Sequence, residues 1–209
     1  MGEKLKILTN RCALWKSMAK LLELNQYLIR EKFLKIFGNE FRIMDSNDNL
    51  YGFCEQKRFR IKEDLRIYDD GQMNNEWLVI KQRNLVDAWG GFDIIDPKKG
   101  VRLGTIRRKF WKSLLRTKWE LLDSDENDIG VLIEDSLGYA IARRTFLGIL
   151  PKKYTLWTAG DDQPITMRQK FNPIIKKLVV SIPPSHTFDR RFIAGLAIVI
   201  AALDGRGSK

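Results

Sequence analysis

The sequence contains few of the residues on which many active sites and covalent frameworks depend. Its 209 residues include two cysteines, Cys12 and Cys54, and a single histidine, His186. Two cysteines are too few for a disulfide framework or, without other ligands, for a structural zinc site, and they indicate a reduced, intracellular chain. Ser185 and Asp189 flank His186, but no nucleophile elbow, phosphate-binding glycine loop or Cys-x-x-Cys pair accompanies them. We therefore predict a protein that is not an enzyme, has no cofactor or metal, and acts on no small-molecule substrate.

Long apolar runs are also scarce. No N-terminal run resembles a signal peptide, and the start of the chain lacks the Ser or Thr of a myristoylation site. The one long run, residues 192–203, has no polar side chain, but a helix of this length spans roughly 18 Å of a hydrocarbon core about 30 Å thick. The run therefore favours a helix at residues 189–204 that is buried inside the protein over a transmembrane segment.

Acidic residues are outnumbered. The sequence has 37 Lys and Arg against 26 Asp and Glu, a formal net charge of +11. Such a surface attracts polyanions, and charge alone does not decide between nucleic acid and an anionic membrane surface. The aromatic fraction of 11% is ample for a sizeable core.

Most of the chain consists of short alternating segments separated by turn residues. Four segments end in an Asp that opens a polar turn, and they recur at roughly 24 to 27 residues. These four segments are Phe41–Asp45, Leu65–Asp69, Phe92–Asp96 and Trp119–Asp123. Further strands are expected at residues 50–54, 76–80, 101–106, 129–133, 139–143, 153–157, 165–169 and 174–180. About a dozen strands without intervening helices predict a closed antiparallel β-barrel, since closure removes exposed edges.

We expect two parts in this chain. Residues 1–26 form an N-terminal amphipathic helical segment, and residues 27–209 form the barrel, with the apolar helix as its central filling. Within the first part, Trp15, Met18, Leu21 and Leu22 recur at helical spacing. Such a stripe favours packing against one end of the barrel over lying on a membrane surface.

The order of these features resembles the tubby-like superfamily, which joins the tubby C-terminal domain, the phospholipid scramblases and the LURP-one-related proteins. Residues 27–45 look like the opening of scramblase-like and LURP-one-related chains. Residues 103–110 and 117–123 are similar to the tubby pattern of a Gly-x-x-Arg strand followed by a Thr-Lys-aromatic strand. The resemblance covers residues 27–204 and implies a barrel of twelve strands around the C-terminal helix. Residues 181–191 lack the acidic calcium-binding segment of scramblases, so calcium-driven lipid scrambling is not implied.

The resemblance also implies a binding site. Tubby domains bind phosphatidylinositol bisphosphate through a Lys-x-Arg pair, and Lys81 and Arg83 fall at the matching place, with Arg107, Arg108 and Lys109 as basic neighbours. Strand alternation puts Lys81 and Arg83 on one face about 7 Å apart, where two cations can hold one multivalent phosphate. A solvated polar face is the alternative interpretation of these residues.

One further motif superficially matches a calcium-binding loop. Asp123, Asp125 and Asn127, followed by Glu134, occupy ligand positions, but Asp128 stands where the loop requires Gly. A hairpin turn is therefore favoured.

Three functions remain open. The first is a non-enzymatic barrel, cytoplasmic or peripheral at a membrane, that binds anionic phospholipid headgroups. The second is a nucleic-acid-binding barrel in which bases stack on Phe110 or Trp111. The third is a structural interaction module whose basic surface only maintains solubility.

Overall fold

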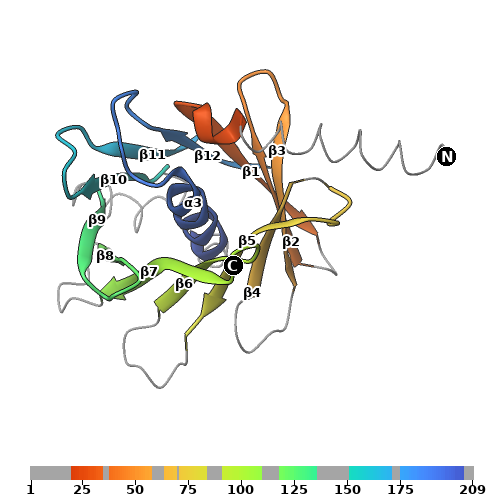
Figure 1. Ribbon diagram of the computed structural model, residues 1–209. Coiled ribbons are helices and arrows are strands. Elements are labelled where there is room, and N and C mark those ends of the chain that lie inside the picture. Colours follow the sequence, from red (N-terminus) through yellow and green to blue (C-terminus); the bar gives the residue numbers. More distant parts are fainter. Residues whose placement is uncertain are drawn as a thin grey trace.

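The computed structural model describes residues 20–34, 38–57, 64–69, 71–83, 91–109, 118–135, 151–170 and 175–204. Twelve strands surround one helix (Figure 1). The strands are β1 (Gln26–Leu34), β2 (Gly38–Met44), β3 (Leu50–Lys57), β4 (Asp64–Tyr68), β5 (Glu76–Gln82), β6 (Gly91–Asp96), β7 (Val101–Lys109), β8 (Lys118–Leu122), β9 (Asp128–Glu134), β10 (Lys153–Thr158), β11 (Ile165–Lys170) and β12 (Lys176–Ser181).

The strands form a closed antiparallel barrel in which each strand pairs with its neighbour in sequence. The barrel closes where β1 pairs with β12, with Leu28 opposite Val179. The closed barrel of about twelve strands predicted from the sequence is confirmed. One expected strand, residues 139–143, lies outside the described residues.

Alternation along each strand separates an apolar interior from a polar exterior. In β2, Phe41 and Ile43 are fully buried, whereas Arg42 between them is exposed. In β11, Ile165 and Met167 are likewise fully buried, and Arg168 is exposed. This period of two puts apolar side chains inside the barrel and leaves most cations outside.

The interior is filled by the helix α3 (Arg190–Asp204), as Figure 1 shows. The helix contacts β1, β5, β6, β7 and β12, and its small residues allow this close approach. A Cβ added to Gly195 would lie 2.9 Å from Ile94 Cδ1. The backbone N–H of Arg191 donates to Asp189 Oδ1 over 2.8 Å, so Asp189 caps the helix. The predicted C-terminal helix is thus present inside the barrel.

Two of the Asp-led turns share one arrangement of hydrogen bonds. Asp45 Oδ1 accepts from the backbone N–H of Asn47 and Asn49, and its Oδ2 accepts from Asn49 Nδ2. The side-chain hydrogen bond from Asn49 is the largest of the effects that lower the pKa of Asp45 to about 2. Asp123 repeats the pattern with Asn127, so its carboxylate closes a hairpin turn, as expected for this motif.

The end of the N-terminal segment packs on the barrel. Residues 20–23 are helical, and Leu21 is 2% exposed within the core. The carbonyl of Leu24 accepts a hydrogen bond from Arg190 Nη1 over 2.5 Å, beside the start of α3. These contacts join the segment to one end of the barrel; residues 1–19 of the predicted segment lie outside the described residues.

Candidate functional site

Lys81 and Arg83 lie at the end of β5 on the outside of the barrel. Leu78 and Ile80 point inward, since Leu78 contacts the helix at Gly195 and Ile80 is fully buried. The Lys81 side chain alternates to the outer face and is exposed, and it lies in register with Asp64 of β4 and Asp93 of β6. Lys81 is therefore flanked by one carboxylate on each side.

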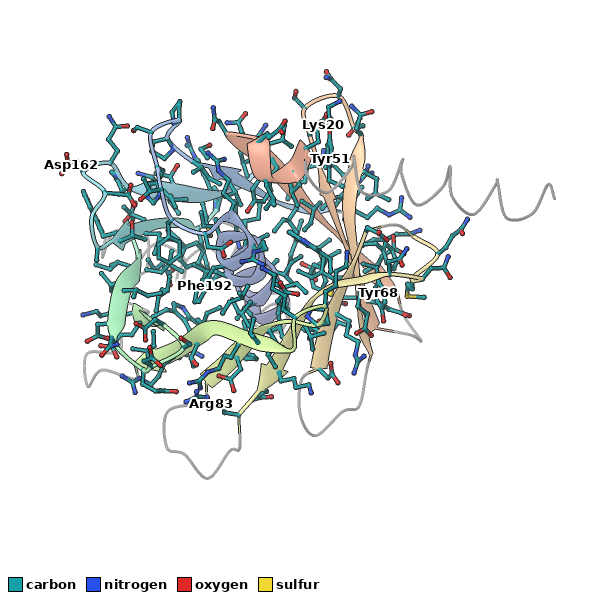
Figure 2. All side chains as sticks on the ribbon, in the orientation of Figure 1. Lys20, Tyr51, Tyr68, Arg83, Asp162 and Phe192 are labelled. Carbon is teal, nitrogen blue, oxygen red and sulfur yellow. The ribbon has the colours of Figure 1, made fainter. Side chains whose placement is uncertain are left out.

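The Arg83 guanidinium is held by several acceptors at once. Its Nε donates to Asp93 Oδ1 over 2.8 Å, and its Nη2 donates to Glu126 Oε1 over 2.6 Å and to Thr105 Oγ1 over 2.9 Å. The hydrogen bond to Glu126 is the main reason that the pKa of Arg83 is raised, and it is also the main reason that the pKa of Glu126 is lowered. Figure 2 shows Arg83 outside the barrel and Phe192 in its interior.

Arg102 completes this cluster. Its Nη1 donates to Glu126 Oε1 over 2.7 Å and lies 3.7 Å from Asp93 Oδ1. Two arginines thus face two carboxylates, and the formal charges of Arg83, Arg102, Asp93 and Glu126 cancel. Sequence reasoning missed three of these four residues, although the Asp-led repeat points to the turn that carries Glu126.

The three cations predicted on β7 do not share one environment. Arg107 lies on the outer face and pairs with Glu120, with Nη2 3.0 Å from Oε2, while its buried Nε has no partner among the described residues. Arg108 alternates to the inner face at the end of the strand, where its guanidinium lies 5.5 Å from the centre of the Trp119 ring. Lys109 ends β7, and its side chain lies outside the described residues. The structure therefore brings together Lys81, Arg83 and Arg107, but not Arg108, on the outside of β5–β7.

A second basic surface lies on the other side of the barrel, and we call it the cross-strand cation row. Arg42 is opposite Arg30, Arg30 is opposite Lys177, and Lys177 is opposite Lys170. Four adjacent strands, β2, β1, β12 and β11, thus each contribute one cation to a continuous row on the outer face. Arg42 pairs with Glu40 over 2.6 Å. Within the described part of the chain, the other three cations have no carboxylate partner.

Two more cations border this row. Arg168 on β11 lies opposite Lys153 on β10, and both side chains are exposed. Lys153 pairs with Asp135, with Nζ 3.2 Å from Oδ2. The sequence gives no signal for the row, because its two halves, Arg30 with Arg42 and Lys170 with Lys177, are more than a hundred residues apart and meet only through strand register.

The side chain of the single histidine has partners on the β10–β11 hairpin, and no hydrogen bond joins it to Ser185 or Asp189 among the described residues. His186 Nδ1 lies 3.2 Å from Asp161 Oδ2, and its Nε2 lies 3.2 Å from Thr158 Oγ1. Its side chain is 1% exposed, and burial lowers its pKa. Asp161 also accepts a hydrogen bond from the backbone N–H of Thr187 over 3.0 Å, so this cluster ties the β10–β11 turn to the segment before α3.

Among the residues that the structure describes, no group of three or more His, Cys, Asp or Glu side chains could hold a metal ion. None of the helices in the described ranges is long and apolar enough to cross a bilayer.

The architecture defines the class of protein: a closed barrel of twelve antiparallel strands wrapped around an apolar C-terminal helix. The model of the LURP-one-related family matches residues 25–201, which is most of the chain. The protein therefore belongs to the LURP-one-related family, as its sequence pattern predicted. A search of curated proteins found no match.

Proposed function

We propose that this protein is a non-enzymatic barrel that binds the phosphate groups of anionic phospholipid headgroups on its basic outer surface. The observation that carries the proposal is the cross-strand cation row. Like charges directly opposite each other on neighbouring strands destabilise a sheet. The four cations of the row therefore repel one another across the strands, and a bound polyanion would relieve that repulsion.

The row also has the dimensions of an extended contact. Neighbouring strands are about 4.8 Å apart, so the three steps from Lys170 to Arg42 cover roughly 14 Å. Each Lys or Arg close to an anionic bilayer contributes about 1 kcal/mol to membrane attraction. Lys81 adds a cation on the opposite side of the barrel, whereas Arg83 is already neutralised by Asp93 and Glu126, and Arg107 pairs with Glu120.

A lipid surface is favoured over single-stranded nucleic acid because the described surface around the row lacks stacking platforms; the predicted stacking residues, Phe110 and Trp111, lie outside the described residues. Proteins that bind single strands combine cations with exposed aromatic rings. Among the described residues, Trp157 is the only aromatic side chain with a large exposed area, 46%. It lies opposite Val131 and outside the cross-strand cation row. The cations of the row are thus arranged to contact phosphates without contacting bases.

The test is flotation of the protein with neutral, phosphatidylserine-containing and phosphoinositide-containing vesicles, at low and physiological salt. We expect flotation with both kinds of anionic vesicle and not with neutral ones. Lys170→Ala/Lys177→Ala should weaken flotation, whereas the matched control Lys98→Ala/Lys99→Ala, which removes two exposed cations from the β6–β7 turn, should not.

Absence of flotation with every anionic vesicle at physiological salt would refute the proposal. An electrophoretic mobility assay with single-stranded RNA and DNA, run in parallel, distinguishes the alternative. Tight binding there, with an affinity that falls steeply with salt, would instead indicate a nucleic-acid-binding barrel.

A further inference from the structure

The two ends of the barrel are formed by different loops and by opposite ends of the helix α3. The turns β2–β3, β4–β5, β6–β7, β8–β9 and β10–β11 lie together at the end where α3 begins, and we call this end the turn rim. Phe192, in the first turn of α3, contacts the position of Gly104, close to the start of β7. Ala201, near the end of α3, lines a small pocket with Lys176 and Lys177, so the other strand ends surround the C-terminus of the helix. We call that end the basic rim.

The balance of positive and negative charge differs between these two ends. The turn rim contains more carboxylates than cations, because each of the five hairpin turns contributes at least one carboxylate, whereas the cations at this end are Lys98, Lys99, Arg102, Arg190 and Arg191. These carboxylates are Asp45, Asp48, Asp69, Asp96, Asp123, Asp125, Glu126, Asp161 and Asp162. At the basic rim, cations outnumber carboxylates. The strand ends there carry Lys32, Lys81, Arg107, Lys118, Lys152, Lys153, Lys170, Lys176 and Lys177, against Glu31, Glu55, Asp64, Glu120, Glu134 and Asp135. The barrel is therefore electrically polar along its axis.

The basic residues of the rim lie on opposite walls. In the closed order of twelve strands, β6 is six positions from β12, which is half of the circumference. The wall around β6 carries Lys81, Arg107 and Lys118 on β5, β7 and β8, while the wall around β12 carries Lys170 and Lys177. A flat surface that lies along one wall cannot reach the other wall. A flat surface that meets the rim end-on reaches both.

From this geometry we infer that the barrel docks end-on to an anionic bilayer, with the basic rim toward the lipid phosphates and the turn rim toward water. The inference rests on the proposed lipid binding and specifies its orientation. Attraction of the basic rim and repulsion of the acidic turn rim favour the same orientation, because both follow from one negative surface potential. The reach of that potential, about 8 Å at physiological ionic strength, confines the attraction to the rim nearest the bilayer.

The first experiment compares the two walls by flotation with phosphatidylserine-containing vesicles. The variants are Lys81→Ala/Lys118→Ala on one wall, Lys170→Ala/Lys177→Ala on the other, their combination, and the control Lys98→Ala/Lys99→Ala at the turn rim. At about 1 kcal/mol per Lys, each wall pair should lower the partition coefficient roughly 30-fold, and the combination should lower it by more than either pair. The control should bind at least as well as the wild type.

The second experiment measures orientation directly. In a Cys12→Ser background, a fluorophore is attached at Lys118→Cys on the basic rim or at Asp162→Cys on the turn rim, and vesicles carry a headgroup quencher. Cys54 is fully buried and should remain unlabelled. End-on docking predicts strong quenching at position 118 and little at position 162.

These results separate the orientation from the proposed function. If only one wall pair weakens flotation, or if positions 118 and 162 are quenched equally, the protein binds lipid but not end-on, and this inference is refuted. If the wild type floats with no anionic vesicle, the proposed function itself fails, and the docking orientation fails with it.

Discussion

Replacing Gly104 with Ala is the most direct test of how the barrel packs on its helix. Gly104 adopts φ of +154°, a conformation that side chains other than glycine rarely allow. An added Cβ would lie 2.2 Å from the carbonyl oxygen of Leu122 and 2.6 Å from Cε2 of Phe192. The residue also sits at an irregularity in the ladder, where Ile94 pairs with Gly104 but Ile95 pairs with Arg102. Gly104 is the glycine of the Gly-x-x-Arg pattern in the sequence.

The expected cost follows from two separate effects. A residue held in a disfavoured backbone conformation costs about 1–3 kcal/mol, and an overpacked site costs about the same again. The sum is about 2–6 kcal/mol, a large fraction of the 5–15 kcal/mol by which folded domains are typically stable. For a chain of this size, a loss of 4 kcal/mol lowers Tm by roughly 8–16 °C.

The assay is equilibrium urea denaturation together with a thermal melt, with Gly71→Ala as the matched control. A Cβ at Gly71 meets nothing within 4 Å, so this control should change the unfolding free energy by less than about 0.5 kcal/mol. Phe192→Leu removes the ring atom that the new Cβ would meet, but the Leu122 carbonyl stays. The double variant Gly104→Ala/Phe192→Leu should therefore be less destabilised than the sum of the two single changes. Equal stability of Gly104→Ala and Gly71→Ala would refute the close approach on which this reasoning depends.

Three further predictions concern residues that hold the fold together. Burial lowers the pKa of His186, so the unfolded chain takes up a proton at higher pH than the folded chain does. The free energy of unfolding should therefore be constant above about pH 7 and fall as the pH drops below about 6.5. His186→Gln should flatten that fall between pH 5 and 7, measured by urea denaturation at each pH, and an unchanged profile would contradict the assignment. Burial raises the pKa of the Cys54 thiol to about 12, so in a Cys12→Ser background a thiol reagent should react only after denaturant is added; rapid reaction of the native protein would show that Cys54 is accessible. Arg191 Nη1 lies 2.8 Å from Asp96 Oδ2 and joins the start of α3 to β6, so Arg191→Ala should cost about 1–3 kcal/mol by urea denaturation, against almost nothing for the exposed control Lys99→Ala.

The sequence by itself determined the local elements, because each of them depends on residues that are close together in the chain. The alternation at Phe41–Asp45 and its three repeats predicted strands, and the Asp at the end of each repeat predicted the turn. At Asp45 and Asp123, one carboxylate accepts hydrogen bonds from the backbone two and four residues ahead. The wholly apolar run at residues 192–203 predicted a buried helix, because no face of it could remain in water. These local elements, taken together, were enough to indicate a closed barrel.

The tertiary structure alone decided which charges meet. Glu126 neutralises Arg83 from 43 residues away, and Arg30 is brought beside Lys177 only because β1 closes the barrel against β12. The register of the sheet decides whether a cation lies opposite a carboxylate on the next strand. A shift of one residue in that register would exchange the inner and outer faces. The sequence therefore determined that the protein would be a basic barrel around a helix. The register of the closed sheet determined that Arg83 would be neutralised and that cations from β11, β12, β1 and β2 would form one row on the outer face.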